Sequence, residues 1–285
     1  MLATLDRLLV RCPDHLALAT ACEPGTGLCT VVGIDGSFSR RIGAQLAVRA
    51  DGSTVGSLAD GCLEAQLAAD IARLDRAETV RYGHGSQMID FRLPCGGGLD
   101  ILLDPAPDRA ACRAALATLA DRQTARLTLA SNALLAERIY VPALRVAAFG
   151  EGPELIAFAR LAAAMDVATE TFDKGQLALG QPADDCRFDP WTAALLLFHD
   201  HEWELPLLEQ ALASDAFYIG AQGGENARIA RALALTARGV AEETVARITS
   251  PVGLIPACKN PETLALSALA QIVAESEQLH AANSR

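Results

Sequence analysis

Apolar and polar residues alternate over short stretches in the first half of the chain, which is typical of strands with one buried face. Apolar residues recur at helical spacing over 62–76 and 109–121, and a further helix is predicted over 1–12. The pair Asp51-Gly52 lies between two alternating runs and predicts a hairpin. The predicted strands cover residues 16–21, 29–33, 44–49, 54–58, 79–82, 89–93 and 99–103, with two more near Leu127 and Ile139.

The second half of the chain alternates apolar runs with longer helical patterns. The runs predict strands over residues 144–149, 167–172, 193–198 and 216–219. The helical patterns cover residues 153–165, 204–214, 226–238, 241–247 and 261–277. Strands that alternate with helices of this length form a parallel sheet covered on both faces. The sequence therefore predicts an α/β fold in two domains, an N-terminal α+β domain over residues 1–142 and a Rossmann-like parallel-sheet domain over residues 143–285.

Charge and cysteine usage narrow the classes of partner and compartment. The chain has 35 acidic and 24 basic residues and a net charge of -11, which argues against nucleic acid or an anionic membrane surface as the main partner. No apolar run reaches membrane-spanning length, and charges interrupt the N-terminal stretch, unlike a secretory signal. The eight cysteines are scattered without a compact disulfide framework. These features favour a cytoplasmic protein with reduced thiols.

Two of the cysteines lie among glycines. Cys62 follows Gly61 and begins a predicted helix, and Cys95 precedes Gly96 and Gly97. Glycine lacks a Cβ atom, so the chain can turn sharply and a bulky ligand can approach the main chain. Thiolates are nucleophiles and soft metal ligands, which makes Cys62 and Cys95 candidate metal ligands.

The loop over residues 36–44 carries a serine and two arginines between glycines. Ser37 supplies a hydroxyl group, and Arg40 is followed by a second arginine, Arg41. A guanidinium group binds phosphate oxygens in a bidentate manner, so the loop suits a phosphate or a pterin-like anion. Loop arginines are also common on solvated surfaces, and the loop taken alone leaves both interpretations open.

The second half begins with the outline of a dinucleotide site. Gly150-Glu151-Gly152 lies between a predicted strand and helix, and Asp173 follows the next strand, where a carboxylate binds ribose. Leu155 replaces the third glycine, Glu151 adds a negative charge beside the expected pyrophosphate, and Pro153 lacks an N–H group. These departures favour a Rossmann-like domain without a dinucleotide, and an NAD(P)-dependent oxidoreductase is the alternative.

A second candidate loop follows the strand predicted over 193–198. His199, Asp200 and His201 lie at the carboxyl end of this strand, the edge at which ligands bind in open α/β sheets. In an extended segment the two imidazoles point the same way and Asp200 points away. Zinc requires a further ligand, so lining of a pocket and capping of the next helix both remain open. Glycines 223 and 224 place another loop at the same edge.

Taken together, these segments resemble the xanthine dehydrogenase accessory protein family, XdhC/CoxI. In the first domain the resemblance is carried by the segments Gly36 to Ala44, Gly56 to Glu64 and Cys95-Gly96-Gly97. In the second domain it is carried by Gly150-Glu151-Gly152, His199-Asp200-His201-Glu202, Leu205-Pro206, Tyr218-Ile219-Gly220-Ala221 and Ile248 to Leu254. Ser39 departs from the usual proline, Asp60 departs from the usual glycine, and residues 222–225 lack a basic continuation.

The resemblance implies a chaperone that binds molybdenum cofactor, a molybdopterin, rather than an enzyme. Such a protein protects the cofactor, assists its sulfuration with a cysteine desulfurase, and inserts it into a xanthine dehydrogenase-type molybdenum hydroxylase apoenzyme. A homodimer is left open, and a scaffold that binds only proteins is a further alternative. The residues expected to contact the cofactor are Ser37, Arg40, Gly61, Cys62, Cys95, Gly96, Gly97, Gly150, Gly152, Asp173, His199, Asp200 and His201.

Overall fold

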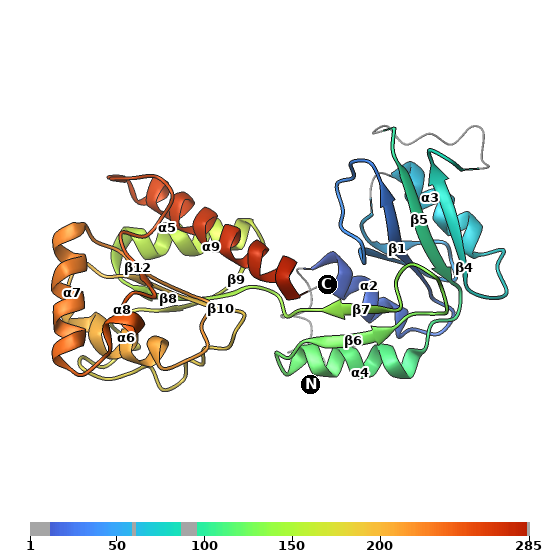
Figure 1. Ribbon diagram of the computed structural model, residues 1–285. Coiled ribbons are helices and arrows are strands. Elements are labelled where there is room, and N and C mark those ends of the chain that lie inside the picture. Colours follow the sequence, from blue (N-terminus) through green and yellow to red (C-terminus); the bar gives the residue numbers. More distant parts are fainter. Residues whose placement is uncertain (1–11, 59–60, 87–95, 284–285) are drawn as a thin grey trace. The chain divides into compact units, whose positions relative to one another are not determined.

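The computed structural model describes residues 12–58, 61–86 and 96–283 (Figure 1). Contacts divide the chain into two compact units, Met1–Pro142 with Asn283–Arg285, and Ala143–Ala282. The helix predicted over 1–12 and the strand predicted over 89–93 fall almost wholly or wholly outside the described residues, and so does Cys95.

The first unit is built on a five-stranded antiparallel sheet with the strand order β3-β2-β1-β5-β4. Its strands are β1 (Gly27–Asp35), β2 (Gln45–Val48), β3 (Thr54–Gly56), β4 (Glu78–Gly83) and β5 (Gly98–Asp104). The predicted hairpin is confirmed, because β2 and β3 pair on either side of Asp51-Gly52. A separate two-stranded sheet joins β6 (Ala125–Thr128) to β7 (Glu137–Tyr140).

Helices cover both faces of this sheet. Successive side chains of a strand point to opposite faces, so both faces carry apolar residues that must be buried. Cys29 and Val31 of β1 face a core shared with α3 (Gly61–Ile71), whereas Leu28 faces a core shared with α2 (Pro13–Ala21) and α4 (Arg109–Ala120). The second core also contains buried residues of β6 and β7. The predicted helices over 62–76 and 109–121 correspond to α3 and α4.

The strand predicted over 16–21 is wrong, because these residues form the second half of α2. The segment alternates leucine and alanine, which imitates the two-residue period of a strand. Alanine is the strongest helix former, and Pro13 occupies the first turn, where its missing N–H group costs nothing. Leu18 and Ala21 are fully buried in the core beneath the sheet, so packing also favours the helix.

The second unit contains a five-stranded parallel sheet with the strand order β12-β11-β10-β8-β9, which confirms the predicted α/β class. Its strands are β8 (Arg145–Gly150), β9 (Ala168–Phe172), β10 (Thr192–Leu197), β11 (Tyr218–Ala221) and β12 (Ile248–Thr249). The two-residue strand β12 was not predicted, because two residues carry no measurable periodicity. Every residue of the central strand β10 is buried.

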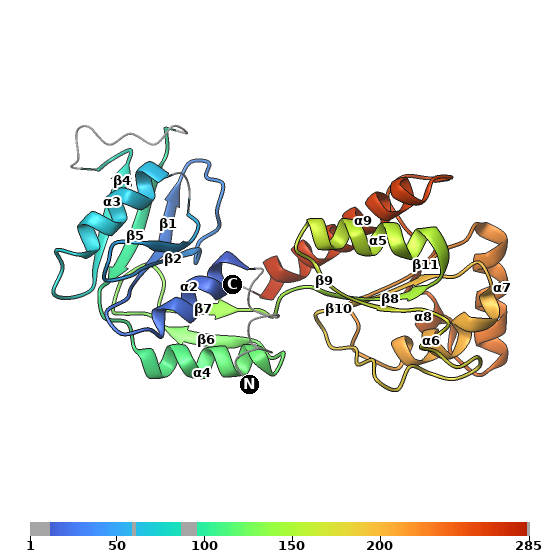
Figure 2. The same ribbon diagram turned by 180° about the vertical axis from the view of Figure 1, so that it is seen from behind.

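Helices lie on both faces of the parallel sheet (Figures 1 and 2). One core contains residues of α5 (Gly152–Ala164) and α9 (Pro261–Asn283), and the opposite core contains residues of α6 (Glu204–Leu212) and Leu235 of α7 (Glu225–Ala237). A short helix, α8 (Glu242–Val245), precedes β12. Within the described parts of the chain, none of the helices combines the length and apolar character needed to cross a bilayer.

Candidate functional site

Three loops of the first unit begin at the same edge of its sheet, where the strands β1, β3 and β4 end. Antiparallel pairing places Gly56 of β3 opposite Leu46 of β2, and Asp35 of β1 opposite Gly98 of β5. Gly98 also pairs with Gly83 at the end of β4. The loops that follow β1, β3 and β4 therefore converge at this edge, which we call the loop edge. These are the three segments that carried the family motifs of the first domain.

Arg40 connects two of these loops directly. Its Nε atom donates to the carbonyl oxygen of Ser57 at 3.1 Å, and its Nη2 atom lies 3.1 Å from Ser57 Oγ. Ser57 belongs to the loop that leads into α3. The main-chain N–H of Leu58 donates to Glu64 Oε1 at 3.0 Å, which fastens the start of α3 to the same loop. Cys62 is exposed in the first turn of α3.

The described part of the Cys95 loop lies beside the Ser37 loop. A Cβ atom added to Gly36 would lie 3.5 Å from the Cα atom of Gly97. The carbonyl oxygen of Gly97 accepts a hydrogen bond from the main-chain N–H of His84 at 2.9 Å, so the two ends of this loop are tied together. Ser37 and Gly96 are exposed, whereas Gly97 is buried. Cys95 itself lies outside the described residues.

Two glycines of the loop edge border open space. Among the described residues, no neighbouring atom lies within 4 Å of a Cβ atom placed on Gly61 or Gly96. The φ angle of Gly96 is 68°, which favours glycine on conformational grounds alone. Gly61 has no positive φ, so neither its conformation nor the packing around it requires glycine. Its missing side chain leaves room beside Cys62 for a ligand to approach the main chain.

A charged cluster that the sequence did not indicate holds the loop edge together. Arg81 of β4 lies between two carboxylates, with Nη1 2.8 Å from Asp100 Oδ2 and Nη2 2.8 Å from Asp35 Oδ2. Its Nε atom donates to the carbonyl oxygen of His84 at 3.0 Å. The imidazole of His84 is mostly exposed, and its Nδ1 atom lies 3.5 Å from Asp35 Oδ2. Arg81 therefore fixes the ends of three neighbouring strands.

Two glycines make room for this cluster. A Cβ atom on Gly98 would overlap the Arg81 guanidinium, and one on Gly33 would lie 2.5 Å from Asp100 Oδ2. The residues involved come from three strands and are far apart along the chain, so no local spacing reveals them. Gly33 inside the mostly apolar strand β1 was the available signal, because an interior glycine often marks a close approach of another group.

Loops of the second unit meet at the carboxyl edge of its parallel sheet, as predicted. Lys174, which follows Asp173, lies 2.8 Å from Glu151 Oε1 and 3.5 Å from Asp200 Oδ2 through its Nζ atom. His199 Nε2 lies 3.3 Å from Glu154 Oε2. These ion pairs join the loops after β8, β9 and β10 into one rim. Lys174 was not predicted, although it is one of only two lysines in the sequence.

The two histidines of the rim do not share the orientation predicted for an extended segment. Asp200 instead begins a 3-10 turn over His201–Trp203, and its carboxylate accepts a hydrogen bond from the main-chain N–H of Glu202 at 3.2 Å. His199 contacts Glu154, whereas His201 Nδ1 lies 3.1 Å from Glu204 Oε2. The turn separates the two rings because it ends the strand geometry. Across the residues that the structure describes, no group of three His, Cys, Asp or Glu side chains could hold a metal ion.

The Gly-x-Gly turn has a structural explanation within the sheet. A Cβ atom on Gly150 would lie 2.6 Å from the carbonyl oxygen of Leu197, so pairing of β8 with β10 requires glycine there. Leu155 is buried in the core beneath α5. The carboxylate of Asp173 accepts a hydrogen bond from the main-chain N–H of Gly175 at 2.8 Å. The acidic side chains at the start of α5, Glu151 and Glu154, oppose binding of a pyrophosphate there.

A buried ion pair connects the loop after β10 to the end of β11. Glu204 is fully buried, and its Oε2 atom lies 2.9 Å from Nε of Arg231, which is also buried. Arg231 Nη2 donates to the carbonyl oxygen of Gln222 at 2.8 Å and so holds the end of β11. Burial raises the pKa of Glu204, and the charges of Arg231 and His201 oppose this shift.

Both units of the chain match known protein families. Residues 146–272 match a family described as the XdhC Rossmann domain, and residues 23–83 match the XdhC and CoxI family. The molybdenum cofactor insertion chaperone PaoD of Escherichia coli (strain K12) is 33% identical over 275 residues, which cover 90% of this chain and 84% of PaoD. The chain belongs to the XdhC/CoxI family.

The family assignment confirms the resemblance drawn from the motifs. The XdhC and CoxI match includes Ser37, Arg40, Gly61 and Cys62, and ends at the last residue of β4. A crystal structure from Bacillus halodurans, described as a xanthine dehydrogenase, has a TM-score of 0.69 and 20% identity to this XdhC/CoxI chain. The aligned region covers 92% of this chain and 95% of the Bacillus halodurans chain. At 20% identity, the similarity shows the fold alone.

Proposed function

We propose that this XdhC/CoxI protein is a molybdenum cofactor-binding chaperone and that the loop edge of its first unit holds the cofactor. The convergence of the Arg40, Cys62 and Gly97 loops at one edge carries this proposal. The space beside Gly61 supports it, because neither its conformation nor the packing of the described residues requires glycine at that position. The similarity to PaoD, which is named as a molybdenum cofactor insertion chaperone, supports the same conclusion.

The chemistry of the loop edge suits this cargo. The exposed sulfur of Cys62, together with Cys95, would bind or shield the molybdenum, since sulfur ligands suit a soft metal centre. Gly61, Gly96 and Gly97 would let the flat pterin approach the main chain. Arg40 would exchange its contact with Ser57 for the cofactor phosphate, and the Ser37 hydroxyl would add a hydrogen bond.

The rim of the second unit belongs to the proposal as a second contact surface for the cofactor. Its expected contact residues are Gly150, Gly152, Asp173, His199, Asp200 and His201. Lys174 is the cation of the described rim, and it is already paired with Glu151 and Asp200. An anionic ligand would therefore have to displace a carboxylate from Lys174. We do not advance an NAD(P)-dependent oxidoreductase, because the carboxylates of Glu151 and Glu154 oppose the dinucleotide pyrophosphate.

The proposed partners follow from transfer of the cofactor. The protein would accept sulfuration of the bound cofactor from a cysteine desulfurase and insert the product into a xanthine dehydrogenase-type molybdenum hydroxylase. A donor and an acceptor must both reach the metal, and the exposed position of Cys62 in the first turn of α3 allows such access. The similarity to a cofactor insertion chaperone supports the acceptor more strongly than the desulfurase.

Retention of the cofactor by cysteine variants tests the proposal. The wild type, Cys62→Ala, Cys95→Ala and the control Cys258→Ala are purified without oxygen, and molybdenum and pterin are measured per chain. Cys258 is half-buried in the second unit and serves as the matched thiol. We expect the wild type and Cys258→Ala to retain cofactor and the other two variants to lose most of it. Equal retention by all four proteins would reject the proposed site.

A further inference from the structure

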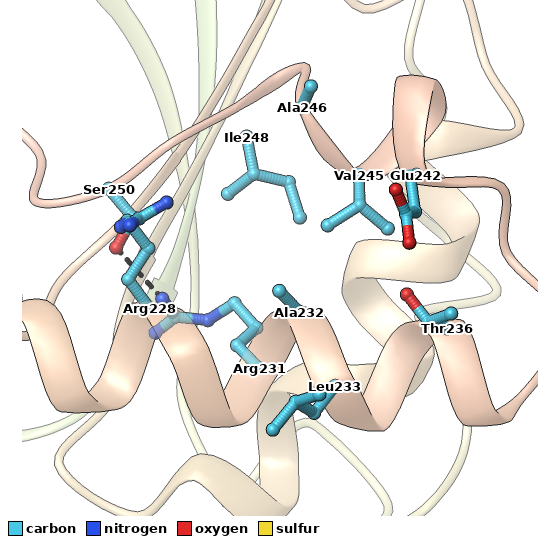
Figure 3. A pocket seen from close by; sticks show the side chains of 10 residues that line it. All are labelled: Arg228, Arg231, Ala232, Leu233, Thr236, Glu242, Val245, Ala246, Ile248 and Ser250. Carbon is cyan, nitrogen blue, oxygen red and sulfur yellow. Dashed lines mark hydrogen bonds between the residues drawn. The ribbon is translucent and has the colours of Figure 1, made fainter.

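The second unit contains a pocket of about 480 Å³ between α7, α8 and β12 (Figure 3). This volume lies within the range of small-molecule sites, roughly 300–1,000 Å³. The pocket is lined from α7, α8 and the segment around β12, so it is separate from the Gly150-Glu151-Gly152 turn after β8. It belongs to the second unit, whereas the loop edge belongs to the first.

One end of the pocket presents hydrogen-bond donors. Figure 3 shows Arg228 and Arg231 together with Ser250 at this end. Arg231 is buried, and its Nη1 atom donates to Ser250 Oγ at 2.9 Å. Its Nε and Nη2 atoms contact the Glu204 carboxylate, and Nη2 also donates to the carbonyl oxygen of Gln222. A guanidinium carries five N–H groups, so one on Nη1 has no acceptor among the residues described. The fixed guanidinium can donate it to an oxygen in the pocket.

Arg228 adds a second, exchangeable cation. Its Nε and Nη2 atoms contact the Glu225 carboxylate at 2.9 and 2.5 Å. Both side chains of this pair are at least half exposed, with exposed fractions of 50% and 60%. An exposed ion pair of this kind contributes little to stability, so a ligand anion can displace Glu225 at little cost. Displacement would leave the charge of Arg228 facing the pocket.

The rest of the pocket is apolar in the middle and polar at the far end. Ala232 forms one wall, and Val245 and Ile248 face it from the opposite side (Figure 3). Thr236 and Glu242 lie at the end away from Ser250. Thr236 lies eight positions after Arg228 along α7, which corresponds to about 12 Å of helix. The pocket thus suits an elongated ligand with an anionic end, a flat apolar body and hydrogen-bond donors at its other end.

We propose that this pocket binds a nucleoside monophosphate. Its phosphate would contact Arg228, Arg231 and Ser250, and its base would lie between Ala232 and the facing side chains of Val245 and Ile248. Glu242 would accept a hydrogen bond from an amino group of the base. This inference is independent of the proposed cofactor site, because it uses none of the residues of the loop edge.

Binding of AMP to the full chain tests the inference by isothermal titration calorimetry. Adenosine lacks the phosphate and inorganic phosphate lacks the body, so each should bind about tenfold more weakly than AMP, or weaker still. Arg228→Gln should weaken AMP binding by a similar factor. Its control is Arg238→Gln at the C-cap of the same helix, which breaks another, partly exposed Arg–Glu pair and should leave binding unchanged.

A second pair of variants tests the apolar part of the pocket. Ala232→Phe fills the space between the walls, whereas Ala230→Phe changes an exposed position of α7 that does not line this pocket. We expect only Ala232→Phe to abolish AMP binding. Absence of AMP binding to the wild type would overturn the inference. It would also be overturned if adenosine bound as tightly as AMP, or if neither Arg228→Gln nor Ala232→Phe weakened binding.

Discussion

The cysteines differ in burial, and this difference distinguishes the proposed cofactor ligand Cys62 from cysteines that pack in the hydrophobic cores. Cys62 is exposed, whereas Cys29, Cys112 and Cys186 are buried. Burial raises the pKa of Cys112 and of Cys186 to about 12 and raises the pKa of Cys29 as well. These three sulfurs therefore remain protonated thiols at neutral pH and act as apolar side chains. No disulfide forms among the cysteines within the described ranges.

Alkylation of the native chain with iodoacetamide at about pH 8 checks this division. We expect Cys62 to be modified well before Cys29, Cys112 and Cys186, which should react only after unfolding in denaturant. The reason is access combined with the raised pKa of the buried thiols. Peptide mass spectrometry over time gives the rate for each site. Modification of Cys112 as fast as Cys62 in the folded chain would contradict the structure.

Arg231 compensates a carboxylate that burial disfavours. Replacing it by methionine leaves Glu204 buried with only His201 as a charged neighbour, so the pKa of Glu204 should rise further. A carboxyl group with a raised folded-state pKa contributes stability below its unfolded pKa, and that stability is lost as the pH rises. We therefore expect Arg231→Met to lower the free energy of unfolding by about 3–5 kcal/mol at neutral pH, and by less in mild acid.

Urea denaturation at several pH values between about 5 and 8 measures this effect. Arg238→Met is the control, because the Arg238–Glu209 pair is partly exposed and should contribute far less to stability than the buried pair. If the cost of Arg231→Met did not grow with pH, the buried pair would not be what stabilises this rim.

The sequence indicated candidate functional residues in segments that contain glycine, as with Cys62 and Arg40. It did not indicate Arg81 or Lys174, because their partners lie on other strands or loops and no spacing along the chain links them. Asp35 and Asp100, for example, meet only when β1 pairs with β5. Pairings of this kind depend on the tertiary fold, which single-sequence patterns do not contain.

At the scale of elements, periodicity predicted most helices and strands of both units. It was wrong over 16–21, where alternating leucine and alanine imitated a strand and the first-turn proline decided for a helix. It also missed β12, whose two residues join the sheet only through their parallel pairing with β11. The predicted extension of the His199–His201 segment was wrong because Asp200 begins a turn there.

Two glycine variants in the first unit should behave oppositely. Gly98→Ala places a Cβ against the Arg81 guanidinium and 2.6 Å from the carbonyl oxygen of His84, so it should lower the free energy of unfolding by about 1–3 kcal/mol. Gly61→Ala meets no described atom within 4 Å and should change stability by about 0.5 kcal/mol or less. Chemical denaturation compares the two. A larger loss for Gly61→Ala would show that packing, not a ligand, explains this glycine.

At the scale of the whole molecule, each unit has its own hydrophobic cores and its own edge at which motif-bearing loops meet. The first unit places its family motifs at one edge of an antiparallel sheet, and the second places its motifs at the carboxyl edge of a parallel sheet. The net charge of -11 fits a protein that handles small ligands and protein partners rather than nucleic acid. The loop edge of the first unit is the surface at which we propose that molybdenum cofactor binds.

Protection of Cys62 from alkylation by the bound cofactor is a direct measurement of binding at the loop edge. Chain produced in cells that cannot make the cofactor is incubated without oxygen with or without molybdenum cofactor, and the labelling rates of Cys62 and Cys258 are compared. We expect the cofactor to slow labelling of Cys62 by a large factor and to leave the labelling rate of Cys258, in the other unit, unchanged. Cofactor that bound without altering the rate at Cys62, or that failed to bind, would contradict the proposal.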